Sequence, residues 1–199
     1  MTVLSDKEIK QLILRKKIVI HPILAEKQIQ GAKIDLRLGN IIYLIKYFEQ
    51  ACYDPKAKEN IEYGEEKQIN FDSPFILQPG DFAIAPLFER VRLPDNIIGR
   101  LDGRSSFGRL GIIIHATAGG IDPGFCGKIT CELSNLGKVP VALHPLTRIA
   151  SLTLERLDTA AERPYNIRSD RKYKSVLYTL LSDDYEYRES LFEKLTPNL

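Results

Sequence analysis

The sequence predicts a mainly β domain with one short helix near its N-terminus. From residue 18 onward, short apolar runs recur at close spacing and are broken by Gly, Pro, Asn and Asp, which are common turn residues. No long segment of helical periodicity alternates with these runs, which argues against a parallel βαβ sheet. Many short strands are typical of a sandwich, a jelly roll or a barrel. The 199 residues suffice for one well-buried domain and are few for two.

The helix is expected over residues 5–16. Ser5 and Glu8 have the spacing of a capping box, and apolar residues recur after them at helical spacing. Examples of the apolar runs that suggest short strands are residues 18–23, 41–45, 82–88, 97–101, 111–116, 128–133, 139–143 and 148–154.

Two polar segments interrupt or follow these runs. Residues 49–70 are polar and charged, so we expect a surface loop or an irregular insertion there. Residues 165–199 are rich in charge and tyrosine and lie beyond the last expected strand. They are expected to form a lid or a docking tail at the end of a single domain that spans residues 1–199.

Composition and charge exclude several classes of protein. A net charge of +2 argues against a generic nucleic-acid binder. The N-terminus has no apolar signal core and no run approaches membrane-spanning length, so a cytoplasmic location without membrane contact is expected. Cys52, Cys126 and Cys131 lack framework spacing, which indicates free thiols in a reducing compartment. Cys126 and Cys131 have no histidine nearby, so zinc is not expected.

A basic, hydroxyl-rich turn is the first candidate binding site. Arg104, Ser105, Ser106 and Arg109 lie close together in a glycine-containing stretch. Guanidinium forks, hydroxyls and turn N–H groups suit a polyphosphate, although the same residues also suit a solvated surface turn. The spacing of a Walker loop is absent.

Glu132 is the candidate general base. Strand alternation places it on one face with Thr130 and Ser134, and places apolar side chains on the other face. That polar face either meets solvent or lines a cleft, and periodicity does not choose between the two. In a cleft, the carboxylate could accept a proton from water.

Three other polar residues have simpler expected roles. Asp122 lies in an Asp-Pro-Gly turn, which it is expected to cap through its own backbone. His115 ends an apolar strand and is expected to be a hydrogen-bonded core residue. Asp35 is expected to be a turn carboxylate or an ion-pair partner of Arg37.

These motifs together resemble the dCTP deaminases, members of the trimeric dUTPase-like superfamily. The strongest match is GRSSxGRLG followed by HxTAG, IDPG and a glutamate. The resemblance covers nearly the whole chain, at residues 4–9, 34–40, 77–85, 90–111, 115–135 and 163–173. It implies a distorted jelly-roll or barrel-like fold of the dUTPase type, a homotrimer, and active sites built between subunits.

The resemblance also implies a role for each matching residue. Glu132 matches the catalytic glutamate, with Arg109, Ser105 and the backbone near Ala118 positioning the attacked base and water. Asp122 matches a residue that binds the deoxyribose. The implied substrate-binding positions are Arg104, Ser105, Ser106, Phe107, Gly108, Arg109, Asp122, Thr130, Cys131, Glu132, Tyr165 and Lys172.

The implied activity is deamination of dCTP to dUTP and ammonia without zinc, with Mg²⁺ accompanying the triphosphate and dTTP a possible inhibitor. The zinc deaminase signature of H-x-E followed by P-C-x-x-C is absent. One alternative is a bifunctional enzyme that also hydrolyses dUTP to dUMP and pyrophosphate. Another is a nucleotide-binding protein without activity on the same scaffold. The chain departs from the family at Val176, where a lid glutamine is expected, and at Gly120, where a larger side chain is usual.

Overall fold

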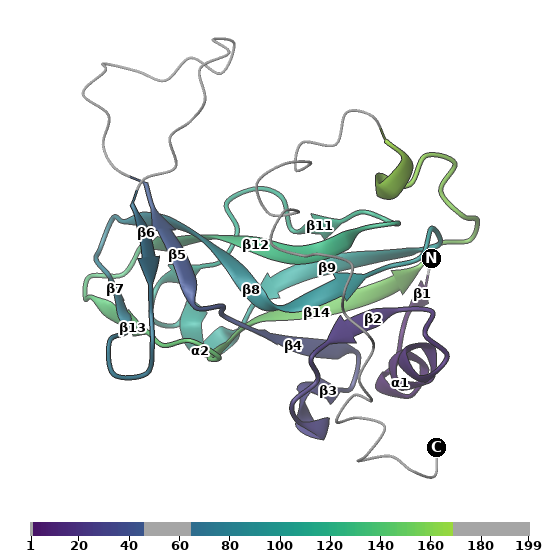
Figure 1. The fold of residues 1–199 in the computed structure, drawn as a ribbon, viewed down its shortest axis with the longest axis horizontal. Coiled ribbons are helices and arrows are strands. Elements are labelled where there is room, and N and C mark those ends of the chain that lie inside the picture. Colours follow the sequence, from purple (N-terminus) through teal and green to yellow (C-terminus); the bar gives the residue numbers. More distant parts are fainter. Residues whose placement is uncertain (1, 46–64, 169–199) are drawn as a thin grey trace.

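The computed structural model describes residues 2–45 and 65–168. Two six-stranded sheets pack face to face in these ranges (Figure 1). The first sheet runs in the order β11 (Gly120–Ile121), β9 (Ile97–Gly103), β14 (Arg148–Arg156), β4 (Lys33–Arg37) and β3 (Ile29–Gln30), with β1 (Thr2–Val3) also paired to β14. The second runs β10 (Ile112–Ile113), β12 (Cys126–Asn135), β8 (Phe82–Arg92), β5 (Ile41–Leu44) and β6 (Glu66–Gln68), with β2 (Val19–His21) also paired to β8.

Smaller elements complete the described part of the chain. These are the two-stranded pair β7 (Phe75–Leu77) and β13 (Val141–Leu143), the helices α1 (Asp6–Leu14) and α2 (Ser105–Gly108), and the 3₁₀ turns η1 (Glu26–Gln28) and η2 (Tyr165–Ile167). Every strand pair in the described ranges is antiparallel. The mainly β prediction is confirmed, whereas a single domain over residues 1–199 stays a prediction.

The N-terminal helix is confirmed together with its capping box. The Ser5 hydroxyl accepts a hydrogen bond from the Glu8 N–H at 3.3 Å, and the Glu8 carboxylate accepts one from the Ser5 N–H at 3.0 Å. The Ser5 N–H and the Ser5 hydroxyl, which both donate to the Glu8 carboxylate, hold the pKa of Glu8 below its usual value. Ile9 and Ile13 on the opposite side are buried. The cap therefore sets where the helix begins and which face it buries.

The expected loop over residues 49–70 is wrong at one point. Glu66–Gln68 forms β6, which pairs with β5 at the edge of the second sheet. Both terminal residues of β6 are exposed, so the strand is held by backbone pairing and carries no apolar signature. Residues 46–64 lie outside the described ranges.

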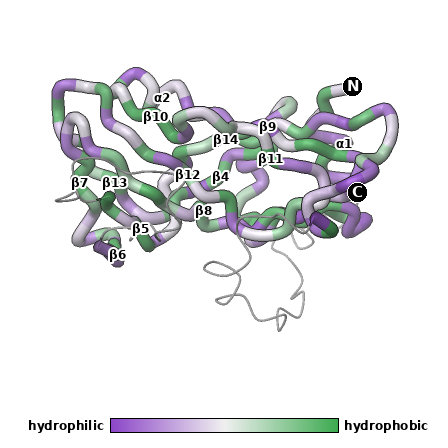
Figure 2. The backbone as a smooth tube through the Cα atoms, turned by 90° about the horizontal axis from the view of Figure 1, so that it is seen from above, coloured by the Kyte–Doolittle hydropathy of each residue, from purple (hydrophilic) through white to green (hydrophobic). Residues whose placement is uncertain are grey.

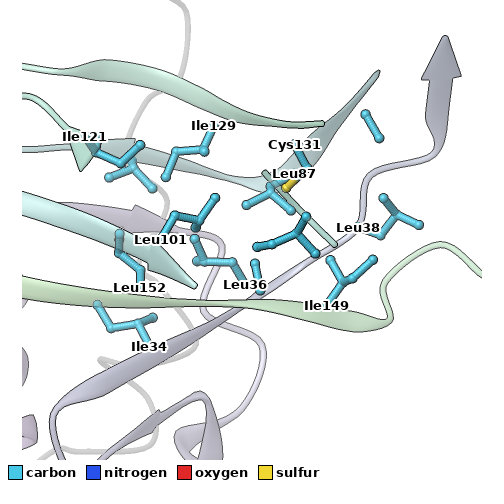
Figure 3. Close-up of a cluster of buried hydrophobic side chains, with 14 of the residues drawn as sticks. Ile34, Leu36, Leu38, Leu87, Leu101, Ile121, Ile129, Cys131, Ile149 and Leu152 are labelled. Atoms are coloured by element: carbon cyan, nitrogen blue, oxygen red, sulfur yellow. The ribbon is translucent and has the colours of Figure 1, made fainter. Parts of the chain in front are cut away.

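The core lies between the two sheets. Ile34, Leu36 and Leu152 from the first sheet face Leu87 and Ile129 from the second (Figure 3). Along β8 buried and less buried residues alternate, and hydrophobic and hydrophilic residues are interspersed along the backbone (Figure 2). Burial of this apolar surface is the main favourable contribution to folding.

The chain passes from the first sheet to the second between β4 and β5. Leu38 bridges to Leu87, and the Gly39 N–H donates to the Pro86 carbonyl at 3.0 Å. A Cβ at Gly39 would lie 2.6 Å from that carbonyl oxygen. The crossing therefore requires glycine, because no other residue allows the two backbones to approach so closely.

A buried ion pair joins the sheets beside this crossing. Glu89 on β8 is fully buried, and its carboxylate accepts from the Arg37 Nε at 2.5 Å and from the Arg37 backbone N–H at 2.8 Å. The Gln28 amide donates to the same carboxylate at 2.9 Å, and Arg37 also donates to the Pro22 carbonyl at 3.0 Å. One carboxylate thus satisfies donors from β4 and η1 together.

We expect Glu89→Gln to lower the free energy of unfolding by about 3–5 kcal/mol, because the new amide group turns donors toward donors and leaves Arg37 unpaired. Urea denaturation followed by circular dichroism measures the change. The matched control is Glu26→Gln, which weakens an exposed pair with Lys10 at 3.7 Å and should cost less than about 1 kcal/mol. Equal effects of the two variants would contradict the role assigned to Glu89.

Candidate active site

Glu132 lies on the outer face of β12 and is held by a neighbouring loop. Its Oε2 accepts a hydrogen bond from the Ala116 N–H at 2.9 Å, and its own N–H donates to the Ile114 carbonyl at 2.9 Å. Glu132 is half-buried, so the carboxylate is placed by the backbone and still reachable. A carboxylate with one oxygen fixed can use the other to hold or deprotonate water.

The alternation expected along this strand is confirmed. Thr130 is exposed and Ser134 is half-buried beside Glu132, whereas Ile129, Cys131 and Leu133 are buried. Burial raises the pKa of Cys131 to about 12, with a smaller contribution from the Glu132 charge. Cys131 could therefore meet a ligand only through its backbone.

The loop that holds Glu132 also carries Ala118. Ala118 is exposed, and the next residue, Gly119, accepts from the Leu101 N–H at 2.7 Å through its carbonyl. A Cβ at Gly119 would lie 2.8 Å from the Leu101 carbonyl oxygen, so the loop is pressed onto β9. In contrast, a Cβ at Gly120 would meet no atom within 4 Å, so space does not explain that departure from the family.

The expectation for His115 in the same loop is wrong. Its Nδ1 is buried and has no hydrogen-bond partner in the described structure. The apolar run before it indicated burial but carried no information about a partner, because side-chain hydrogen bonds depend on distant residues.

The basic turn forms α2 and presents its side chains outward. Ser105, Ser106 and Arg109 are exposed, as is Gly108. Phe107 is half-buried and packs against the core, which anchors the turn. This surface offers hydroxyls and a guanidinium to a ligand or to another subunit.

The pairing suggested for Asp35 is wrong. Asp35 accepts from Arg104 at 2.8 Å and from Arg148 at 3.1 Å. Arg37 is instead turned to the buried Glu89, because a nearly buried guanidinium requires a buried partner. Spacing along one strand did not reveal partners contributed by other segments.

Asp122 and the C-terminal end of the described chain form a separate cluster. The turn is closed by the Asp122 carbonyl, which accepts from the Phe125 N–H at 3.1 Å, while the Asp122 carboxylate pairs with Arg168 at 3.1 Å. The expected capping of this turn through the backbone of Asp122 is therefore confirmed. The Tyr165 N–H donates to the Pro123 carbonyl at 2.8 Å, and its ring lies 5.8 Å from that of Phe125.

Gly124 allows this docking. Its φ is +78°, and a Cβ there would lie 2.7 Å from the Asn166 side-chain oxygen. A glycine is required on both counts. The remaining expected lid residues, Lys172 and Val176, lie outside the described residues.

The expected site residues fall into two groups within one chain. No hydrogen bond or ion pair in the described ranges joins Glu132 to Ser105 or Arg109. Figure 1 shows α2 and η2 well apart, so Ser105 and Tyr165 do not meet in one subunit. Within residues 2–45 and 65–168, no group of three or more His, Cys, Asp or Glu side chains is placed to hold a metal ion.

The residues missed by the sequence analysis are two arginines. Arg148 and Arg168 each pair with a carboxylate of the expected site region. Arg148 lies outside the matching stretches, and Arg168 lies within the stretch 163–173 but at a position to which the resemblance assigned no role.

Comparison with known proteins establishes the family. A family model described as dCTP deaminase-like matches residues 3–157. The chain belongs to this family. It is similar to a "dCTP deaminase, dUMP-forming" of Dictyoglomus turgidum, with 48% identity over 86% of this chain and 89% of the relative. The protein of the same name from Methanothermobacter thermautotrophicus is 45% identical over 96% of this chain and 99% of its own length.

A solved structure agrees with the fold. The 2′-deoxycytidine 5′-triphosphate deaminase of Agrobacterium tumefaciens superposes with a TM-score of 0.63 and 24% identity, covering 78% of this chain and 48% of that chain. The dUTPase-type fold expected from the sequence is confirmed. No helix in the described residues is long and apolar enough to cross a membrane.

We expect iodoacetamide at pH 8 to alkylate Cys126 and leave Cys131 unmodified in the native protein. Cys126 is half-buried, whereas Cys131 is buried and its raised pKa keeps it a thiol far above pH 8. In urea the pKa of Cys131 returns to about 8.5 and it should react. Mass spectrometry of the digested protein measures each site, and rapid native alkylation of Cys131 would contradict its placement.

Proposed function

We propose that this protein deaminates dCTP and hydrolyses the product to dUMP. Support for the substrate comes from the family and from relatives named as dUMP-forming dCTP deaminases. Those names favour the bifunctional alternative over release of dUTP. The observation that carries the proposal is the Glu132 carboxylate, fixed by the Ala116 N–H on the outer face of β12.

The first step replaces the amino group of cytosine. Glu132 takes a proton from water, and the hydroxide forms a bond to C4 of the ring. Glu132 passes this proton to the ring nitrogen next to C4. It then moves the proton of the new C4 hydroxyl to the amino group, the C4–N bond breaks, and ammonia leaves as C4 becomes a carbonyl. General acid–base catalysis by a positioned carboxylate contributes about 10²–10⁴-fold, so orientation by Arg109 and Ser105 is assigned much of the remainder.

The second step hydrolyses the phosphate chain. A second water attacks the α-phosphorus of dUTP, and pyrophosphate leaves. In total, one dCTP and two waters give dUMP, ammonia and pyrophosphate. We assign Asp122 to this water, because its carboxylate is half-exposed and oriented by Arg168. The alternative assignment of Asp122, to the deoxyribose, leaves the overall reaction unchanged.

We further propose that the site is completed by a second subunit in a homotrimer. The support is the separation of α2 from η2 within one chain (Figure 1), together with the exposure of Ser105 and Arg109, neither of which has a hydrogen bond to Glu132 in the described ranges. A neighbouring copy would bring its α2 to the Glu132 face. Cyclic symmetry would then repeat the arrangement at every interface.

Mg²⁺ is proposed to accompany the triphosphate. The exposed Ser105 and Ser106 hydroxyls are hard oxygen donors compatible with a hydrated Mg²⁺ that is held mainly by phosphate. When bound, the ion would neutralise phosphate charge. Inhibition by dTTP stays a prediction of the family resemblance.

Mixing the purified protein with dCTP and Mg²⁺ should give dUMP, pyrophosphate and ammonia, resolved by phosphorus NMR and an ammonia assay. Glu132→Gln should lower the rate of ammonia release by about 10²–10⁴-fold while the protein stays folded, because the amide cannot accept the proton. Glu162→Gln, on an exposed residue, is the matched control.

The products separate the alternatives. Accumulation of dUTP without pyrophosphate would replace the proposal with simple deamination. Tight binding of dCTP without turnover would instead support the alternative hypothesis of a nucleotide-binding protein without activity. Full activity in pure Glu132→Gln protein would overturn the role of the carboxylate.

Co-expression of Glu132→Gln and Arg109→Ala chains should restore activity that neither variant has alone. In a randomly mixed cyclic trimer, each site draws Glu132 from one chain and Arg109 from the next, so about a quarter of the sites would be intact. Activity per purified trimer measures this. No recovery in verified mixed trimers would place both residues in one subunit.

A further inference from the structure

Three charged side chains lie together beside the basic turn that forms α2. The Asp35 Oδ2 on β4 accepts from Arg104 at 2.8 Å and from Arg148 at 3.1 Å. Arg104 immediately precedes α2, and Arg148 is the first residue of β14. One carboxylate oxygen therefore holds two guanidinium groups from segments that are distant in sequence.

A β-bulge produces this convergence. The register of β14 against β4 shifts between Arg148 and Ala150, and both Ile149 and Ala150 are buried. The extra residue in β14 breaks the pairing with β4 and redirects the neighbouring side chain. The carbonyl of Ile149 also accepts from the Arg104 N–H at 3.2 Å. The bulge thus holds the backbone of one arginine and the start of the strand that carries the other.

The cluster of Asp35, Arg104 and Arg148 has more hydrogen-bond donors than Asp35 can accept, and it carries a net positive charge. Two guanidinium groups and one carboxylate leave a net charge of +1, and each guanidinium has five N–H donors. The side chains of Asp35, Arg104 and Arg148 are 19%, 29% and 48% exposed. The arginines are therefore partly ordered by the protein while their outer edges remain accessible.

Stability alone gives little reason for this arrangement. Ion pairs this accessible to solvent contribute about 0–1 kcal/mol, and bringing two cations together is unfavourable without a ligand. A preorganised pair of guanidinium forks is well suited to phosphate oxygens, which accept two parallel N–H bonds. The exposed hydroxyls of Ser105 and Ser106 follow directly in the chain.

We propose that Arg148 binds the phosphate chain of the nucleotide together with Arg104, and that Asp35 is the positioning residue for both. Arg148 lies outside the motif that marks the basic turn, and the bulge at Ile149 makes it part of the same surface. The inference rests on the proposed function for the identity of its ligand, a nucleoside triphosphate.

The test compares Arg148→Ala, Asp35→Asn and the control Lys33→Ala. Lys33 lies on the same strand as Asp35, is exposed, and makes a distant 4.0 Å pair with Asp102, so its removal deletes one positive charge outside the cluster. Calorimetry with inorganic tripolyphosphate measures anion binding, and steady-state kinetics with dCTP measures KM and kcat. Circular dichroism and size exclusion verify the folded assembly.

Arg148→Ala should weaken tripolyphosphate binding and raise KM for dCTP, each by about 10-fold, the usual effect of losing a charged hydrogen bond. The kcat should stay within about twofold if the loss affects ground state and transition state equally. Lys33→Ala should change both binding measures by less than about twofold, because an exposed charge outside the cluster is screened by salt. An unchanged KM and tripolyphosphate affinity in Arg148→Ala would overturn the proposal.

Asp35→Asn distinguishes positioning from simple charge. The variant gains one positive charge, so a purely electrostatic role predicts tighter tripolyphosphate binding. Positioning predicts weaker binding, by about fivefold, because the two arginines lose the oxygen that orders them. Tighter binding would overturn the role of Asp35.

The two proposals fail separately. A wild-type protein that binds tripolyphosphate through Arg148 but does not turn over dCTP would overturn the proposed function and support the phosphate pair. Normal turnover of dCTP with no effect of Arg148→Ala would leave the proposed function intact and overturn the pair. The affinity for deoxycytidine, which has no phosphate, should be the same in Arg148→Ala as in the wild-type protein.

Discussion

The carboxylate of Glu89 is the constraint on which the two-sheet arrangement depends. It is fully buried and gathers donors from β4 and η1 onto β8, the central strand of the other sheet. A buried charge is tolerated only where its hydrogen bonds are complete. This contact therefore fixes the position of β4 relative to β8. Packing of Ile and Leu side chains alone would define that position less well, because these side chains are interchangeable.

The site geometry follows from that arrangement. β12 pairs with β8, the strand that Glu89 links to the first sheet. β8 therefore also sets the face of the second sheet on which Glu132 lies. On the opposite side, β4 carries Asp35 and pairs with β14, which brings Arg148 beside Arg104. The two ends of the proposed reaction, base and phosphate, are thus placed by strands that share one buried contact.

Sequence patterns predicted what depends on local chemistry. The capping box, the alternation about Glu132 and the many short strands could be predicted, because hydrophobic periodicity and turn residues are local signals. Side-chain partners from distant segments of the chain could not be predicted in this way. Asp35 was matched with Arg37 because they are two residues apart, whereas the bulge at Ile149 and the demand of Glu89 for a cation decide otherwise. β6 was missed because an exposed edge strand has no apolar face to reveal it.

The pairing of β1 with β14 has a consequence for synthesis of the protein. The first strand of the described chain joins the last one, and β14 also lies between β9 and β4. The first sheet therefore lacks its middle until residue 156 has been made, whereas the strands of the second sheet are all present by Asn135. During translation the second sheet would expose its apolar inner face while it waits for its partner, and nascent chains are vulnerable to aggregation in that interval.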